Sequence, residues 1–441
     1  MRVLVTGAAG FIGSHVMDRL RAAGHEPIGF DMRPSPHHAK GEVAMVVGDL
    51  LDQDALADAM KGCDAVAHLA AAADVDQVAK NPGAAEELNS RGTLSVLEAA
   101  REAGVPRVVY ASTIWVYDGH ACDVVDEDTP VSQSSHLYTA TKLAGEMYCR
   151  SYAELYGLEF TILRFGIPYG PRARPAAVIP AFVNKALAGE PLTIAGDGSQ
   201  ARRFVYVEDL ADGVVCGLRP TAVNRTYNLA GEEDVTIAQI AATVQGLFDD
   251  VEIVNTPARA GDFSGAPVSS ERAARELGWR AATPFSEGMA QYVEWHVNER
   301  EAAARKAAAA ASPAARAGRA VRSGLSLIPG VAAMFAVCLV AVHLLRADAD
   351  APRAVGVSLL LTLAFLLGAG LDWEANRRRA ITLSVLAFSA FGLALAVPWP
   401  HDALVAMRDH IILASVALVA LIVIGVAVAG WRRAEAPSSS R

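Results

Sequence analysis

The stretch TGAAGFIG at residues 6–13 constrains the fold more than any other part of the chain. Gly7, Gly10 and Gly13 follow the β-branched run RVLVT and open the amphipathic run FIGSHVMDRLRAAG. Glycines at this spacing allow a tight turn and a close approach of the backbone to a bound group, and the helix start offers unpaired N–H groups to an anion. A glycine-rich turn alone is common, but a strand before it and a helix after it predict a phosphate-binding turn.

The same alternation of strand and helix continues through residues 1–170. Short apolar runs such as EPIGFD, AVAHLAAA and RVVYAS are separated by amphipathic patterns of helical length. Repeated βαβ units predict an α/β fold, a Rossmann-type doubly wound parallel sheet that binds ligands at the carboxyl ends of its strands. Residues 171–298 are richer in Gly and Pro and predict a smaller mixed α/β substrate lobe, with segments from about 200–230 returning to the first domain.

An acidic residue closes the second predicted strand. Asp31 lies 18 residues after Gly13, where its carboxylate can accept hydrogen bonds from ribose hydroxyls and would repel a 2′-phosphate. The cofactor is therefore predicted to be NAD rather than NADP. Arg33 could instead pair with a 2′-phosphate, although a solvated arginine is the simpler interpretation. Asp49 and Leu50 follow a third apolar run, VAMVV, and are expected to reach the adenine.

Charge and cysteine content exclude several classes of protein. Residues 1–298 carry 24 Lys and Arg against 39 Asp and Glu, whereas residues 299–441 carry 15 against 9. An acidic body argues against a nucleic-acid partner. Five scattered cysteines without a CxxC pair predict neither a disulfide framework nor a metal site. The N-terminus lacks a signal-peptide pattern, so the first domain is expected to stay in the cytoplasm.

The C-terminal third is apolar enough to predict a membrane anchor. An Ala-rich basic linker at 299–323, helical until Ser312-Pro313, precedes an all-α transmembrane segment at 324–432 and a tail at 433–441. The four apolar stretches each have about the length that crosses a bilayer: Leu325–Leu345, Ala354–Leu371, Ala380–Val397 and Ile411–Trp431. Twelve Lys and Arg on one set of flanks against three on the other predict a multi-pass protein of the cytoplasmic membrane, in contact with lipid, with both termini in the cytoplasm.

Candidate reaction residues lie in ASTIWVYDG and YTATK. Tyr138 and Lys142 are four residues apart, so on a helix they share one face. A phenol is a poor base at neutral pH, but a nearby ammonium and a positively charged nicotinamide would favour its ionised form. A tyrosine and a lysine four residues apart, taken alone, are more often a pair on the protein surface. Downstream of a dinucleotide turn, with the hydroxyls of Ser112 and Thr113 at a preceding strand end, a reaction site is the stronger interpretation.

These motifs together resemble the extended short-chain dehydrogenases/reductases, in particular the NAD-dependent nucleotide-sugar epimerase/dehydratase family. The similarity rests on TGAAGFIG, HLAA, ASTIWVY and YTATK, and continues through LRFGIPYGPR, GDGSQARRFVYVEDLADGV and PARAGD. The resemblance implies that Tyr138 is the catalytic base, that Lys142 orients the nicotinamide ribose and that Thr113 hydrogen-bonds the reacting hydroxyl.

The same resemblance assigns binding residues. The cofactor would contact Gly7, Gly10, Phe11, Ile12, Gly13, Leu69, Ala70 and Ala71. Arg202 and Arg259 would hold the nucleotide diphosphate, a role that suits the planar guanidinium, and Ser112 would support Thr113 at the substrate. The sequence departs from the family pattern at Ile167-Pro168, where epimerases often have an asparagine that lines the substrate pocket.

The reaction predicted is epimerisation of a nucleotide-diphosphate sugar, through transient oxidation of a ring hydroxyl at C4. Ile114 and Trp115 stand where dehydratases of the family carry an Asp-Glu pair and decarboxylases carry a glutamate, so elimination and decarboxylation are disfavoured. A net nucleotide-sugar dehydrogenase or reductase and a non-catalytic NAD-sensing scaffold remain as alternatives. A homodimer is a candidate assembly.

Overall fold

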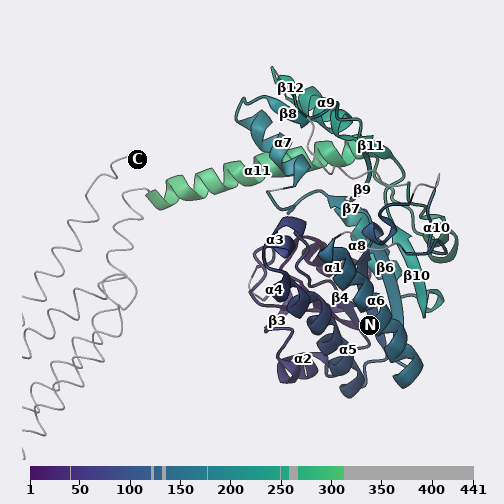
Figure 1. The fold of residues 1–441 in the computed structure, drawn as a ribbon. Helices are drawn as coiled ribbons and strands as arrows, with labels where there is room; N and C mark the ends of the chain where they lie inside the picture. Colours follow the sequence, from purple (N-terminus) through teal and green to yellow (C-terminus); the bar gives the residue numbers. More distant parts are fainter. Residues whose placement is uncertain are drawn as a thin grey trace, which may run out of the picture. The chain divides into compact units, whose positions relative to one another are not determined.

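A computed structural model describes residues 1–39, 41–120, 124–131, 136–175, 177–248, 250–257 and 267–311 (Figure 1). The chain divides into two compact units, Met1–Arg300 and Glu301–Arg441. Arg259 and the four apolar C-terminal stretches lie outside the described residues. Within the ranges described, no helix is both long and apolar enough to cross a membrane.

The first unit is built on a parallel sheet of seven strands, so the predicted Rossmann-type α/β fold is confirmed. The strand order is β10-β6-β5-β4-β1-β2-β3, and every neighbouring pair is parallel. Its strands are β1 (Arg2–Thr6), β2 (Glu26–Asp31), β3 (Ala44–Val47), β4 (Ala65–His68), β5 (Arg107–Thr113), β6 (Glu159–Phe165) and β10 (Arg225–Leu229). The order reverses between β1 and β4, and such a switch point opens a ligand crevice at the carboxyl ends of the strands.

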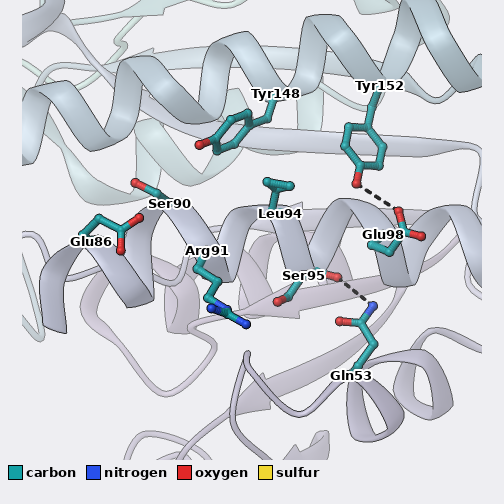
Figure 2. A pocket seen from close by; sticks show the side chains of 9 residues that line it. All are labelled: Gln53, Glu86, Ser90, Arg91, Leu94, Ser95, Glu98, Tyr148 and Tyr152. Atoms are coloured by element: carbon teal, nitrogen blue, oxygen red, sulfur yellow. Dashed lines mark hydrogen bonds between the residues drawn. The ribbon is translucent and has the colours of Figure 1, made fainter. Parts of the chain in front are cut away.

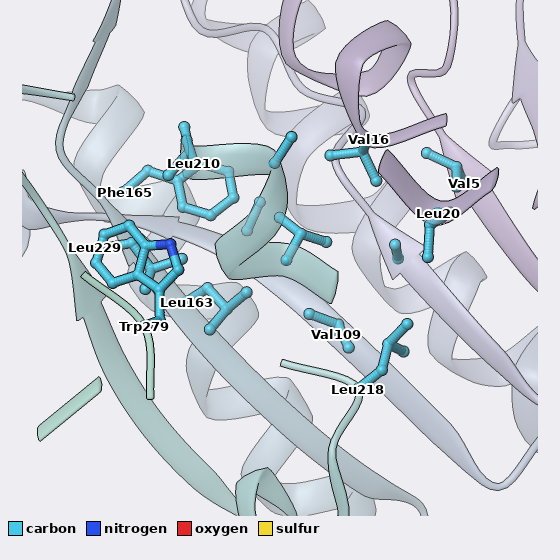
Figure 3. Packing of buried hydrophobic residues seen from close by; sticks show 14 of the residues in the cluster. Val5, Val16, Leu20, Val109, Leu163, Phe165, Leu210, Leu218, Leu229 and Trp279 are labelled. Carbon is cyan, nitrogen blue, oxygen red and sulfur yellow. The ribbon is translucent and has the colours of Figure 1, made fainter. Parts of the chain in front are cut away.

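One face of the sheet is covered by α1 (Phe11–Ala22) and α8 (Val207–Cys216), which also pack against each other. Figure 3 shows the apolar side chains of these helices lying over those of the strands. Val16 and Leu20 of α1 and Leu210 of α8 meet Val109 and Leu163 of the sheet. Alternate strand residues point this way because successive side chains of a strand face opposite sides.

The opposite face is covered by α2 (Gln53–Met60), α5 (Gly92–Glu102) and α6 (Leu137–Tyr156). Leu4, Val66 and Tyr110, the sheet residues between those of the first face, pack here. The segment before α5 contains α3 (Val75–Lys80), α4 (Pro82–Glu86) and the π-helix η1 (Glu87–Arg91). The sheet thus lies between two layers of helices, α1 and α8 on one face and α2, α5 and α6 on the other. Helix α6 packs against β5.

A smaller lobe follows β6. It contains a three-stranded sheet of β7 (Ile167–Tyr169), β9 (Ala201–Tyr206) and β11 (Asp234–Thr236), and a pair of β8 (Leu192–Ala195) with β12 (Ile253–Thr256). Its helices are α7 (Val178–Leu187), α9 (Ile237–Leu247) and the start of α11 (Phe285–Ala311), which share one apolar core. The remaining elements are the 3-10 turns η2 (Ile114–Tyr117) and η3 (Pro220–Ala222) and helix α10 (Glu271–Leu277).

A buried histidine links the ends of β1 and β4. The Thr6 hydroxyl accepts the N–H groups of Leu69 and Ala70, each at 3.2 Å, and therefore donates its proton to His68 Nδ1 at 2.7 Å. His68 Nε2 then donates to the hydroxyl of Thr93 at 3.0 Å. The ring must be neutral to accept from Thr6. Burial, aided by the charge of Lys142, lowers the pKa of His68 to about 3.

This arrangement predicts acid sensitivity. His68 has its ordinary pKa of about 6.5 when unfolded, so below that pH the unfolded chain binds one proton more than the folded chain, and stability falls as the pH falls towards about 3. We expect the difference in unfolding free energy between wild type and His68→Gln to change by about 1.4 kcal/mol per pH unit below pH about 6. Urea unfolding between pH 7 and pH 5 measures it. Equal slopes in the two proteins would show that His68 does not titrate on unfolding.

Candidate active site

The glycine turn after β1 has no room for side chains. Gly7 adopts a φ of 73°, and a Cβ on it would lie 2.9 Å from Ala70 Cα. A Cβ on Gly13 would lie 2.1 Å from the carbonyl oxygen of Gly7. These contacts are with backbone atoms, which cannot move aside as a flexible side chain would. The two glycines let α1 begin directly against the end of β1.

The residues around this turn fit a bound dinucleotide. Helix α1 begins at Phe11 after the N-cap residue Gly10, so the N–H groups of its first turn are directed to the carboxyl edge of the sheet. Phe11 and Ile12 are half-buried there. At the end of β2, Asp31 accepts the N–H of Ala9 at 3.0 Å, which fixes its carboxylate beside the turn. A pyrophosphate on the helix start and a ribose beside the carboxylate match the chemistry of NAD.

The segments after β3 and β4 complete the crevice. Leu69, Ala70 and Ala71 are half-buried, and the N–H groups of Leu69 and Ala70 are held at the end of β1 by the hydroxyl of Thr6. Leu50 is buried in the core, whereas Asp49 is exposed and accepts the N–H of Leu51 at 3.0 Å. The predicted adenine contact of Leu50 would therefore come from its backbone, because its side chain is 4% exposed.

The structure brings the three predicted reaction residues together. Thr113 is the last residue of β5, and its hydroxyl lies close enough to the phenol of Tyr138, in the first turn of α6, to lower the pKa of that phenol. Lys142 follows one turn later and is 3% exposed. Its ammonium donates to the carbonyl oxygen of Ala111 at 2.8 Å and lies over the ring of Tyr110. Two hydroxyls and an ammonium thus meet at the carboxyl end of the sheet.

Burial dominates the electrostatics of Tyr138 and Lys142. It raises the pKa of Tyr138 to about 12, while the charge of Arg174 and the hydroxyl of Thr113 lower it. Burial lowers the pKa of Lys142 to about 8. The predicted effect of Lys142 and a bound nicotinamide on the phenol stays a prediction. Arg174, a cation that sequence reasoning missed, also acts on Tyr138.

Ser112 is placed differently from its neighbour Thr113. Its hydroxyl donates to Glu146 Oε1 at 2.6 Å, and Ser112 itself is 2% exposed. Glu146 is held by Arg164 of β6, whose Nε and Nη2 donate to the two carboxylate oxygens at 2.9 and 2.8 Å. Arg164 also donates to the hydroxyl of Tyr117 at 2.6 Å. Ser112 therefore belongs to a buried polar network behind the reaction residues, and its predicted contact with substrate stays a prediction.

The predicted diphosphate-binding residues lie on the smaller lobe. Arg202 is half-buried on β9, and its Nη1 donates to its neighbour's carbonyl oxygen, that of Ala201, at 2.8 Å. Its role and that of Arg259 stay predictions. Ile167 and Pro168 form β7 with Tyr169 and pair with β9. Within the described ranges, no group of three His, Cys, Asp or Glu side chains is arranged to hold a metal ion.

A cavity of about 510 Å³ on the outer side of α5 and α6 is a separate feature (Figure 2). Tyr148 and Tyr152 of α6 lie over Leu94 and Glu98 of α5, and Tyr152 donates to Glu98 at 2.9 Å. The full lining is Gln53, Glu86, Ser90, Arg91, Leu94, Ser95, Glu98, Tyr148 and Tyr152. It contains none of the predicted cofactor or reaction residues, so this cavity is not the candidate active site.

A switch-point crevice with a glycine turn, an acid at the end of β2 and a tyrosine-lysine helix after β5 defines a dinucleotide-dependent enzyme of the short-chain dehydrogenase/reductase type. More narrowly, the chain belongs to the NAD dependent epimerase/dehydratase family, whose sequence model matches residues 3–230. The predicted cofactor, NAD, and the predicted enzyme class are thereby confirmed.

Individual relatives agree with this assignment. The chain is 34% identical to the UDP-glucose 4-epimerase of Mycolicibacterium smegmatis over 317 residues, which cover 68% of this chain and 100% of the relative. It is 33% identical to UDP-glucuronate 4-epimerase 6 of Arabidopsis thaliana over 333 residues, 67% of this chain and 72% of the relative. A crystal structure of UDP-glucose 4-epimerase from Thermotoga maritima with UDP-glucose matches with a TM-score of 0.64 and 29% identity, over 68% of this chain and 99% of the other.

The crowding at Gly13 predicts a loss of cofactor. In Gly13→Ala the added methyl would meet the carbonyl oxygen of Gly7, so the turn or the helix start must shift away from its place at the end of β1. We expect bound NAD to be lost, with affinity at least about tenfold weaker, because displaced N–H groups no longer converge on the pyrophosphate. The measurement is NAD released on denaturation of the purified protein. Gly24→Ala serves as the control, since a Cβ there meets nothing within 4 Å, although its φ of 78° adds strain.

Proposed function

We propose that the protein is a 4-epimerase of a nucleotide-diphosphate sugar. The observation that carries the proposal is the placement of the Thr113 hydroxyl beside the phenol of Tyr138 at the carboxyl end of β5, with Lys142 one turn further along α6. Relatives of similar sequence are named as 4-epimerases of UDP-glucose and of UDP-glucuronate. Positions 114 and 115 hold Ile and Trp rather than acidic residues, which disfavours elimination and decarboxylation.

The proposed roles of the residues are those that the family resemblance implies, and the positions of the residues support them. Thr113 orients the ring hydroxyl of the sugar, and Tyr138 takes the hydroxyl proton and later returns it. Bound NAD would supply the acceptor and later the donor of the hydride at the same carbon. Lys142 would hold the nicotinamide ribose, and Asp31 would hold the adenosine ribose. If the keto-sugar presents its other face before re-reduction, the configuration at the carbon is inverted and no net oxidation occurs.

Product analysis tests the proposal. The purified chain is incubated with UDP-glucose or UDP-glucuronate, without added NAD, and the nucleotide sugars are separated. We expect the 4-epimer to accumulate to an equilibrium mixture, because each cycle regenerates the cofactor. A net dehydrogenase would instead stop after one equivalent and would produce NADH continuously only when NAD is added. Continuous NADH formation, or no sugar product with bound NAD, would reject the epimerase.

We further propose that the enzyme is held at the cytoplasmic face of a membrane. The support is in the sequence: four apolar stretches of about 18–21 residues with basic residues on the cytoplasmic flanks. The full chain should remain with the membrane fraction after washing in high salt and at alkaline pH, and should be released by detergent. Release by salt alone would indicate a peripheral attachment and reject the anchor.

A homodimer is the third part of the proposal. Helix α6 exposes Met147 (61%) and Leu155 (70%), and the cavity between α6 and α5 lies along the same helix. Apolar side chains this exposed are better accommodated when a second copy covers them. Light scattering during gel filtration in detergent, corrected for bound detergent, gives the mass. A monomer mass at micromolar concentration would contradict this assembly.

A further inference from the structure

An ion pair joins two loops beside the reaction residues. Arg174, between β7 and α7, places Nη1 3.6 Å from Asp74 Oδ2. The side chains are 56% and 37% exposed. Pairs this exposed contribute little to stability. The exposure of both side chains also leaves the pair accessible to a ligand that enters the site.

Both partners are held by rigid elements. Asp74 is the N-cap of α3, where its carboxylate accepts the N–H of Gln77 at 3.0 Å. Two residues before Arg174, the loop is fixed to the cofactor helix α1: Arg172 Nη1 lies 2.9 Å from Asp18, and His15 donates to the carbonyl oxygen of Pro171 at 2.9 Å. The ion pair therefore has a defined place rather than belonging to a free loop.

That place is near the reaction residues. Asp74 lies three residues after Ala71, in the segment that follows β4 along the predicted cofactor site. Helix α3, which Asp74 caps, packs against α6, the helix that carries Tyr138. The charge of Arg174 is felt at the Tyr138 phenol, whose pKa it lowers against the larger effect of burial. A sugar whose hydroxyl reaches Tyr138 would thus have the ion pair among its neighbours.

We propose that the Asp74–Arg174 ion pair makes this site select neutral hexoses over sugar acids. Asp74 supplies the carboxylate that Arg174 would otherwise take from a uronic acid, and it also repels that acid. The inference rests on the proposed function, since it concerns the sugar of the same site. It distinguishes the two substrate types named among the relatives, UDP-glucose and UDP-glucuronate.

The physical basis is a competition between carboxylates. A neutral hexose leaves the ion pair intact and is bound through its hydroxyls. A uronate must displace Asp74 from the guanidinium and then lie close to the displaced carboxylate, and like charges at such distances repel. Removing the charge of Asp74 reverses the situation, because Arg174 then lacks a partner and would favour an anionic ligand. Selectivity by repulsion of the wrong ligand is a general device.

The test measures binding as well as turnover. Dissociation constants of UDP-glucose and UDP-glucuronate are determined by calorimetry on the full chain in detergent with NAD bound. The proteins are wild type, Asp74→Asn and the double variant Asp74→Asn/Arg174→Met. Asparagine keeps the ability to cap α3 while losing the charge. Asp52→Asn is the matched control, because Asp52 caps α2 in the same way, accepting from Ala55 at 3.0 Å.

We expect wild type and Asp52→Asn to bind UDP-glucose at least about tenfold more tightly than UDP-glucuronate. Asp74→Asn should bind UDP-glucuronate about tenfold more tightly than wild type does, with UDP-glucose changed less than about threefold, and the double variant should lose that gain. An unchanged ratio in Asp74→Asn, a wild-type preference for UDP-glucuronate or a gain that survives Arg174→Met would overturn the inference. The dissociation constants test the sugar selectivity even if the protein forms no epimer. Failure to form an epimer would reject the proposed reaction, but not the selectivity.

Discussion

Tyr138→Phe is expected to abolish turnover while NAD stays bound. The substitution removes the phenol oxygen that Thr113 contacts and leaves the ring, so the shape of the site is kept. A positioned acid-base group contributes about 10²–10⁴-fold to a rate. We therefore expect kcat for epimerisation to fall by at least about a hundredfold, with KM changed little, because the lost interaction serves proton transfer rather than binding. Product formation over time and NAD content measure the two effects.

Tyr152→Phe is the matched control for this experiment. It makes the same chemical change on the same helix, but Tyr152 lies in the outer cavity and donates to Glu98, away from Thr113 (Figure 2). Its kcat should stay within about threefold of wild type. Near-normal kcat in Tyr138→Phe would remove the phenol from the mechanism. Equal losses in both variants would indicate damage to α6 rather than to proton transfer.

The parts of the site that the sequence predicted are those set by local structure. The turn with Gly7 and Gly13 and the acid Asp31 were found because a glycine-rich βα turn and the end of the next strand lie within 30 residues. Tyr138 and Lys142 were found because one helical turn relates them. In each case the spacing along the chain determines the geometry, and the parallel sheet followed from the repetition of short apolar runs.

The parts that were missed depend on contacts across the sheet. Arg174 acts on Tyr138 from the lobe, 36 residues further along the chain, and no local pattern shows that β7 leads its loop to the reaction residues. Glu146, which accepts the hydroxyl proton of Ser112, 34 residues earlier, was also missed. The predicted contact of Ser112 with substrate stays a prediction. The only sequence signal was that Glu146 continues the helical face of Tyr138 and Lys142, at intervals of four residues.

The buried pair of Glu146 and Arg164 supports the reaction helix from behind. Burial lowers the pKa of Arg164, but the hydrogen bonds and charge of Glu146 outweigh burial and raise it. The side chains are 4% exposed for Arg164 and 5% for Glu146. The pair joins β6 to α6, and through Ser112 it also reaches the end of β5. Removing either partner of this pair should therefore lower the free energy of unfolding and also disturb the positions of Thr113 and Tyr138.

Glu146→Leu should destabilise the protein strongly. It leaves the guanidinium of Arg164 buried without its carboxylate and removes the acceptor of Ser112. Breaking a buried ion pair from one side costs about 3–5 kcal/mol. We expect that loss in the free energy of unfolding, measured by urea denaturation with tryptophan fluorescence. The exposed pair of Arg280 and Glu271 provides the control, since Glu271→Leu should change stability far less than Glu146→Leu does.

The double variant Glu146→Leu/Arg164→Leu separates the charge from the packing. With neither charge present, no ion is left uncompensated in the core, so the double variant should be more stable than Glu146→Leu alone. A residual defect should remain, because Ser112 and Tyr117 each lose a partner. The single variant Arg164→Leu completes the comparison. If the losses of the two single variants add up to that of the double variant, the pair is not coupled and its burial is incidental. If the losses do not add but kcat of the double variant stays low, the effect on catalysis is separate from the effect on stability. The network then positions Thr113 and Tyr138 through the hydrogen bond of Ser112.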